Sequence, residues 1–181
     1  MSRVLVVACV AVSLLATPAA GSLRSPADGH FRFDLAAASI DGHPLLGNRV
    51  STVTSALGPP TTRSLRHKRY GSMTYGKGYP AKLSVIFRLR GGVRRVTSLA
   101  ITSRGATEAL LGKILRVSPR ELQQKVARAY AGMFRLVKPF RCTTRPASCS
   151  GLFKSVDGKT NLSFGMFPPR RGAPTYLVIY D

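Results

Sequence analysis

The segments NRVSTVTSALGPP (residues 48–60) and KLSVIFRLRGGVRRVTSLAI (residues 82–101) decide the fold that we expect for this chain. In the first segment Val50, Val53 and Leu57 fall on one face of a helix. The glycine and the two prolines that follow are typical of a helix end. The first segment therefore predicts a short amphipathic helix that ends at Leu57.

The second segment predicts a β-hairpin. Apolar and polar residues alternate from Lys82 to Arg90, which is typical of a strand buried on one side. Gly91-Gly92 favours a tight turn, and the chain then runs back as a strand as far as Ile101. A further short strand is predicted from Met73 to Tyr75, after a basic loop. One helix followed by three antiparallel strands is therefore the expected unit.

A similar order of elements follows in the second half. Ser118-Pro119-Arg120-Glu121 is a capping box with proline at the first helical position, and Gly132 is expected to end that helix. Asp157-Gly158 predicts a hairpin turn, and alternating residues predict strands over 162–166 and 176–180. Glu121 thus has a structural role and is not a candidate for catalysis.

The two halves can be overlaid with offsets of 73 to 79 residues. The matched residues are Val53 and Leu57 with Val126 and Tyr130, Tyr75 with Phe153, Leu83, Val85 and Phe87 with Leu162, Phe164 and Met166, and Leu99 and Ile101 with Leu177 and Ile179. We therefore predict an α+β fold of two tandem repeats, each a helix plus an antiparallel three-stranded sheet, with the helices packed on one face. The repeats are expected over 46–104 and 118–181, joined by a connector at 105–117.

The N-terminus predicts export. A short basic start precedes an apolar run from Val4 to Ala16, and small residues follow, so residues 1–21 are expected to be a signal peptide cleaved between Ala19 and Ser22. Cys9 is not expected to be a lipidation site, because the apolar run continues behind it. No later segment is apolar over the ~20 residues that a membrane helix needs. Residues 22–45 are expected to form a mostly flexible lead-in, with a short strand around Phe31 to Leu35.

Two cysteines remain after the signal peptide, Cys142 and Cys149. In an exported chain such a pair predicts a disulfide. No histidine or further cysteine lies near enough in the sequence to complete a metal site, so no metal or other cofactor is expected.

The chain carries 28 lysines and arginines against 7 acidic residues, a net charge of +21. Residues 42–107 contain no acidic residue at all. Such a surface attracts polyanions, although an exported protein also gains solubility from net charge. Tyrosines interleave the basic stretch and favour either base stacking or simple packing. The candidate anion-binding residues are Arg63, Arg66, Lys68, Arg69, Arg94 and Arg95.

The sequence contains no motif of a nucleophilic elbow, a phosphate loop, a dinucleotide fingerprint or a histidine-rich metal cluster. We therefore expect no enzymatic activity, no catalytic residues and no small-molecule substrate.

The run from Leu46-Gly47 to Val53, the segment Leu57-Gly58-Pro59-Pro60 and the strands up to Ile101 resemble a repeat found in two related groups. One is the small SmpA/OmlA-type (BamE-like) lipoprotein of the outer-membrane barrel-assembly machinery, and the other is the secreted beta-lactamase inhibitory protein with two tandem copies. The resemblance implies helices on one face of a sheet whose exposed surface binds proteins. The chain has no tryptophan and only 7 acidic residues. An inhibitor that binds an enzyme would be expected to use aromatic side chains and carboxylates for its contacts.

We therefore expect a secreted or cell-envelope protein that binds or scaffolds an unidentified protein partner without catalysis. The alternative is a basic surface protein for polyanions such as anionic wall polymer, nucleic acid or acidic lipid headgroups. Inhibition of a secreted enzyme such as a beta-lactamase is a third hypothesis. A homodimer through the open sheet face is a further arrangement that the sequence leaves open.

Overall fold

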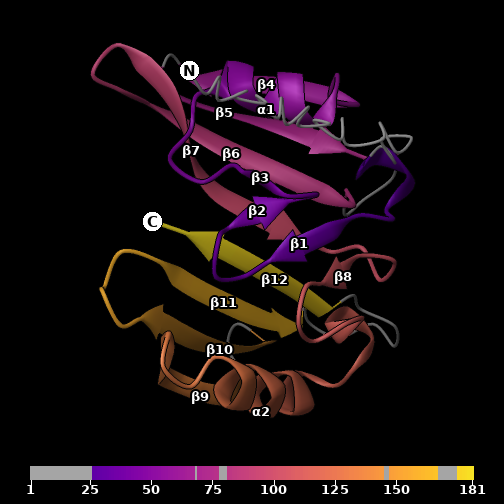
Figure 1. Cartoon of the computed structure of the whole chain (residues 1–181), viewed down its shortest axis with the longest axis vertical. Coiled ribbons are helices and arrows are strands. Elements are labelled where there is room, and N and C mark those ends of the chain that lie inside the picture. The colour runs from indigo at the N-terminus through magenta and orange to yellow at the C-terminus, as the bar shows by residue number, and fades with distance from the viewer. Residues whose placement is uncertain (1–25, 68, 78–80, 145–146, 167–174) are drawn as a thin grey trace, which may run out of the picture.

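The computed structural model describes residues 26–67, 69–77, 81–144, 147–166 and 175–181. These residues form one large and one small β-sheet (Figure 1). In spatial order the large sheet contains β4 (Thr62–His67), β5 (Tyr70–Tyr75), β6 (Leu83–Arg90), β7 (Val93–Ile101), β12 (Thr175–Tyr180), β11 (Asn161–Met166), β10 (Ala147–Ser155) and β9 (Phe134–Thr144). All neighbouring strands in it are antiparallel.

The predicted α+β fold of two helix plus three-stranded repeats is wrong. The described chain is mostly β, with two α-helices and sheets of eight and four strands. Helix α1 (Val50–Leu57) is followed by β4 to β7, and helix α2 (Pro119–Ala129) by β9 to β12. The two sets of strands meet at β7 and β12 and form one continuous sheet.

The prediction missed β4 and β9, which are the two edge strands. An edge strand pairs on one side only, and most described side chains of both strands are exposed, so little apolar alternation marks them in the sequence. In β9 the pairing register with β10 also shifts twice, next to Pro139. Such bulges interrupt the period of two on which strand prediction depends.

The helix ends follow the predicted chemistry closely. Helix α1 ends at Leu57, and Gly58 lies at a φ of 77°. In α2 the Ser118 hydroxyl accepts a hydrogen bond from the Glu121 amide at 3.2 Å, with Pro119 at the first helical position. The Glu121 carboxylate lies 3.2 Å from Lys125 Nζ, one turn on. The Ser118 half of the predicted capping box is therefore confirmed, whereas the Glu121 carboxylate pairs with Lys125 and the helix ends at Ala129, not at Gly132.

The expected flexible lead-in is largely structured over its described residues, which begin at residue 26. It contains the 3₁₀ turn η1 (Pro26–Asp28) and the strands β1 (Arg32–Asp34), β2 (Ser39–Ile40) and β3 (His43–Pro44). These strands join β8 (Thr107–Glu108), from the expected connector, in the order β3-β2-β1-β8. Strands of two or three residues are too short to show a period in sequence, although Phe33, Leu35 and Ile40 are fully buried.

One hydrophobic core underlies the whole molecule. The small sheet, both helices and η2 (Ile114–Arg116) contribute buried side chains to a single cluster with one face of the large sheet. Figure 1 views the molecule from this covered side, with β1 to β3 and α2 in front of the large sheet. The opposite face of the sheet carries none of the other described elements, and we call it the open face.

The expected signal peptide lies in residues 1–21, outside the described residues. Within the described part of the chain, no helix has the length and apolar character needed to cross a membrane.

Candidate functional site

The open face consists of the side chains that alternate with the core residues along each strand. Val85, Leu99 and Ile179 are fully buried on the covered side and lie opposite one another in register. Their chain neighbours therefore point to the open face. Eight strands at about 4.8 Å spacing make this face about 34 Å wide, which is wide enough for a protein interface of standard size.

Two uncharged rows cross the middle of the open face, as the strand registers show. The first row is Thr62, Thr74, Ser84, Ala100, Val178, Ser163 and Leu152. The second row is Ser64, Ser72, Ile86, Ser98, Tyr180 and Asn161. Small side chains allow another backbone to approach closely, while Ile86, Val178 and Tyr180 supply apolar contact area.

Basic residues lie at the β9–β10 end of these rows and beside the second row near the β6–β7 hairpin. On the side of β9 and β10, Lys138 pairs with Leu152 and Arg135 pairs with Lys154. Next to the second row on the other side, Tyr70 pairs with Arg88 and Arg88 pairs with Arg95. The open face therefore has an uncharged centre, with positive charge at its β9–β10 edge and near the β6–β7 hairpin.

The structure separates the six candidate anion-binding residues. Arg94 lies opposite Leu89 in the β6–β7 hairpin, and the Arg69 carbonyl accepts a hydrogen bond from the Leu89 amide at 2.9 Å. These two residues thus lie at adjoining hairpin ends. Arg63 lies opposite Met73, near the start of β4 and several residues before the β4–β5 turn that contains Arg69.

The remaining candidates are placed differently. Arg95 lies on the open face opposite Arg88, and its Nη1 donates a hydrogen bond to the Gly47 carbonyl at 3.1 Å. Arg66 lies in β4, but its side chain and all of Lys68 fall outside the described residues. The structure thus groups Arg69, Arg94 and Arg95 near the hairpin ends.

Two further arginines of the same region, Arg88 and Arg49, were not among the six predicted anion-binding residues. Arg88 was placed on the polar side of a predicted strand, so alternation alone marked it as exposed. Its position beside Arg95 depends on the hairpin register, which shifts by one residue between Ile86 and Phe87. Arg49 forms an isolated antiparallel bridge with Arg95, a contact between the start of α1 and β7 that no local pattern reveals.

The tyrosines of the basic stretch divide between packing and surface roles. Tyr75 is fully buried, its hydroxyl donates to the Gly58 carbonyl at 3.3 Å, and burial raises its pKa to about 12. Tyr70 is exposed, and the Arg88 guanidinium lies 5.0 Å from its ring centroid. Tyr79 lies outside the described residues. Tyr75 is therefore a core residue and cannot stack on a base.

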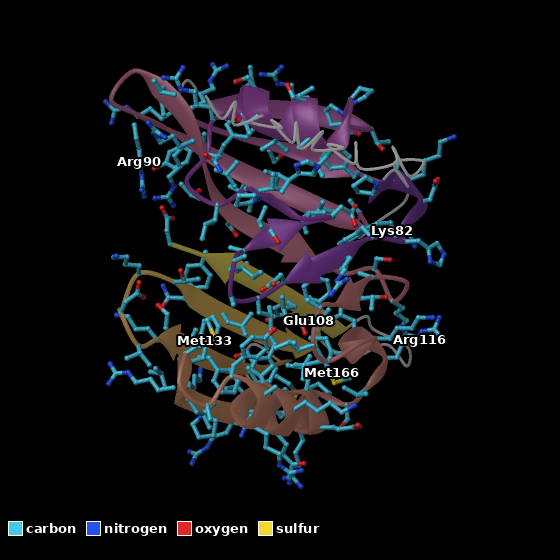
Figure 2. The ribbon with its side chains drawn as sticks, in the orientation of Figure 1. Lys82, Arg90, Glu108, Arg116, Met133 and Met166 are labelled. Carbon is cyan, nitrogen blue, oxygen red and sulfur yellow. A yellow bond between two sulfur atoms is a disulfide. The ribbon has the colours of Figure 1, made fainter. Side chains whose placement is uncertain are left out.

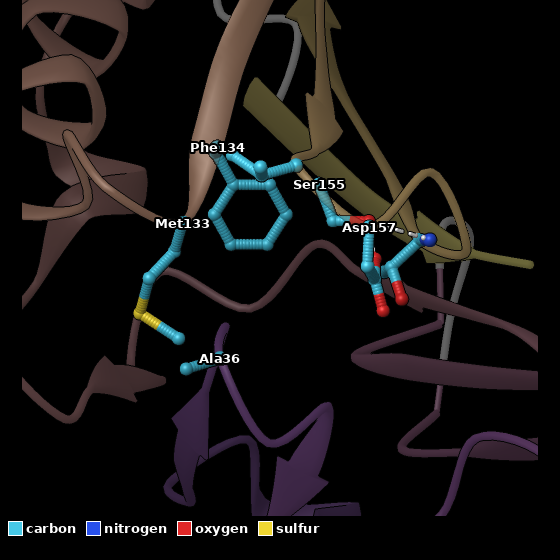
Figure 3. Close-up of a pocket in the computed structure, with 7 residues that line it drawn as sticks. Ala36, Met133, Phe134, Ser155 and Asp157 are labelled. Atoms are coloured by element: carbon cyan, nitrogen blue, oxygen red, sulfur yellow. Dashed lines mark hydrogen bonds between the residues drawn. The ribbon is translucent and has the colours of Figure 1, made fainter.

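A shallow pocket of about 260 Å³ lies between the β1–β2 turn, the start of β9 and the β10–β11 hairpin (Figure 3). The Ser155 hydroxyl donates to Asp157 Oδ1 at 2.5 Å, and the Lys159 amide donates to the same oxygen at 3.1 Å. These bonds lower the pKa of Asp157. They also hold the hairpin turn, so the polar groups of the pocket already have structural partners.

Glu108 is the only acidic side chain classed as buried among the described residues, and it lies inside the molecule (Figure 2). Its Oε1 accepts hydrogen bonds from the Tyr130 hydroxyl at 2.6 Å and the Leu35 amide at 3.3 Å. Its Oε2 accepts from the Leu110 and Leu111 amides, both at 2.8 Å. Burial and the bond to Glu108 raise the pKa of Tyr130. Glu108 therefore joins the small sheet, the β8 loop and the end of α2.

The predicted disulfide is confirmed. Cys142 and Cys149 are directly opposite in the β9–β10 pair, with an S–S distance of 2.06 Å. Among the described residues no group of three or more histidine, cysteine or acidic side chains is arranged to hold a metal ion. Comparisons with protein-family models, with curated proteins and with solved structures found no match for the chain.

Proposed function

We propose that this protein is an exported, non-catalytic module that binds a partner protein through the open face of its large sheet. The observation that carries the proposal is the uncharged pair of rows across a face that no other described element covers. Interfaces of this kind are about as apolar as ordinary protein surface, with tyrosine and arginine enriched. The open face combines Tyr180, Ile86 and Val178 with arginines beside them.

Export is part of the proposal. The apolar N-terminal run supports a signal peptide, and the Cys142–Cys149 disulfide is consistent with an oxidising compartment. The resemblance of residues 46–101 to protein-binding repeats adds support. One of the two groups in that resemblance inhibits a secreted enzyme, so enzyme inhibition is one form of protein binding that the resemblance implies.

The charge of +21 favours a second candidate, the binding of an extended polyanion. Binding of this kind loses affinity steeply with salt and needs no particular arrangement of uncharged residues. The first candidate instead depends on the uncharged rows.

The test is capture of proteins from envelope and culture-fluid extracts by residues 22–181, at low and high salt. Val178→Arg places a charge at the centre of the open face. The matched control is Gln124→Arg, which adds the same charge on the exposed side of α2. We expect the wild type and the control to retain a partner protein at high salt, and Val178→Arg to retain none.

Thermal melting of each variant checks that the fold is intact. Capture that disappears at high salt and is displaced by added polyanion contradicts the protein-binding function. Salt-resistant capture by a folded Val178→Arg protein contradicts the open face as the interface.

A further inference from the structure

Three arginines lie side by side near the β6–β7 hairpin end of the open face, and we call them the arginine row: Arg49, Arg95 and Arg88. Arg88 is the register partner of Arg95, and Arg95 forms a bridge with Arg49. Like charges directly opposite on neighbouring strands are destabilising. The pairing of Arg88 with Arg95 by itself therefore does not stabilise the fold.

Two side chains of the row contact uncharged groups. The Arg88 guanidinium lies over the Tyr70 ring, and Arg95 Nη1 donates to the Gly47 carbonyl. Within the described residues, no carboxylate lies within ion-pair distance of any of the three arginines. An arginine presents five N–H donors, so each of these contacts leaves several donors for a ligand.

A carboxylate already binds beside the row. Asp181 Oδ2 lies 2.8 Å from Nη1 of Arg90, which follows Arg88 by two residues on the same face of β6. Arg90 is the labelled side chain at the hairpin side of the molecule in Figure 2. An arginine at this end of the open face is therefore already paired with a carboxylate.

The neighbouring row decides between classes of partner. On the open face, the next positions along β6 and β7 from Arg88 and Arg95 are Ile86 and Ser98. Tyr180 of β12 lies opposite Ser98. A flexible polyanion gains nothing from these uncharged side chains, whereas a folded protein surface contacts both rows at once. Positive charge at the rim of such a surface guides an acidic partner into register.

We infer that the arginine row binds a cluster of carboxylates on an acidic partner protein, as the charged rim of the open-face interface. This inference rests on the proposed function and names the chemistry of its partner. Planar guanidinium groups bind carboxylates in a two-pronged geometry that lysine cannot reproduce.

The probe for the test is a capped hexaglutamate peptide, titrated into the isotopically labelled protein and followed by NMR, with inorganic polyphosphate of matched charge as a second titrant. The variant is Arg88→Gln with Arg95→Gln. The matched control is Lys154→Gln with Arg135→Gln, which removes an equal charge from a register pair at the other side of the same face.

We expect the peptide to shift the side-chain Nε–Hε signals of Arg88 and Arg95. The dissociation constant should rise at least about tenfold in the arginine-row variant and less than about twofold in the control. Arg88→Lys with Arg95→Lys keeps the charge but should still weaken binding severalfold, because the two-pronged contact is lost. The glutamine variant loses one repulsive pair together with the Tyr70 and Gly47 contacts, so its melting temperature should change little.

Equal losses in the variant and its control overturn the inference, because they indicate diffuse charge attraction. The absence of peptide binding, or tighter binding of polyphosphate than of peptide at the row, overturns it as well. Val178→Arg separates this inference from the proposed function: it should leave peptide binding at the row intact while it abolishes protein capture.

Discussion

At Gly71 and Gly151 the core has no space for a side chain larger than a hydrogen atom. Gly71 pairs with Phe87, and Gly151 pairs with Phe164, in each case with the phenylalanine ring lying across the glycine. A Cβ atom built at either glycine would come within 2.4 Å of ring atoms. These glycines therefore determine how closely the large rings approach the sheet.

Gly71→Ala and Gly151→Ala should each lower the free energy of unfolding by about 1–3 kcal/mol, because overpacking forces the ring or the strand to move. Gly132→Ala is the control, since its added methyl group would meet nothing within 4 Å. Urea denaturation measures the difference. A change as small as that of the control at both core glycines would contradict this account of the packing.

Tyr75 should make stability depend on alkaline pH. The unfolded chain releases the tyrosine proton near pH 10, while the folded protein retains it until the raised pKa of about 12. The stabilisation from the neutral buried phenol is therefore present below pH 10 and is lost progressively as pH rises from 10 to 12. Tyr75→Phe removes this part of the pH dependence.

Urea denaturation of the wild type and of Tyr75→Phe measures this effect at neutral pH and at about pH 11. We expect the difference in unfolding free energy between the two proteins to shift in favour of the variant at the higher pH. Parallel pH curves would show that the phenol ionises equally in both states.

At the scale of elements, the edge strand β9 is protected against pairing with another chain. β9 carries Lys138, Pro139 and Arg141, and charge and proline on an edge discourage pairing with another chain. A disulfide links β9 to β10, and its two cysteines are seven residues apart in the sequence. The disulfide therefore constrains one hairpin and not the sheet as a whole.

Replacing Cys142 and Cys149 together by serine should cost roughly 2–3 kcal/mol, the loop-closure entropy of a short ring. Amide exchange should become faster over 141–144 and 147–150, while the β6 and β7 amides keep their protection relative to global unfolding. A loss that unfolds the protein at room temperature would mean that the bridge orders more than its own hairpin.

At the scale of the whole molecule, the pairing of β7 with β12 joins the two halves of the chain. Leu99 lies opposite Ile179 and also opposite Val85, and all three are fully buried in one core. Because both halves share this core, we expect the molecule to unfold as one cooperative unit.

Leu99→Ala should lower the free energy of unfolding by about 2–5 kcal/mol and leave a single transition. Leu110→Ala is the control, because that side chain is 69% exposed. Amide exchange measured separately in β5 and β11 should show the same loss of global stability in both halves. A loss confined to β4 to β7 would show that the halves unfold independently.

The sequence alone determined the local features of this protein. Gly58 and the prolines after it end α1, Ser118 caps α2, and the cysteine pair forms its disulfide, because each depends on residues close together in the chain. Strands β6, β11 and β12 were also predicted, because burial on one side imposes an alternation, and β7 was predicted from the Gly91-Gly92 turn that precedes it.

Tertiary structure alone decided the rest. The edge strands lack a buried side that would mark them, and the short strands of the N-terminal sheet become ordered only by packing on the core. The arginine row combines Arg49, Arg88 and Arg95 from separate segments through a shifted hairpin register and an isolated bridge. Contacts of this kind depend on long-range pairing, which the order of residues along the chain does not display.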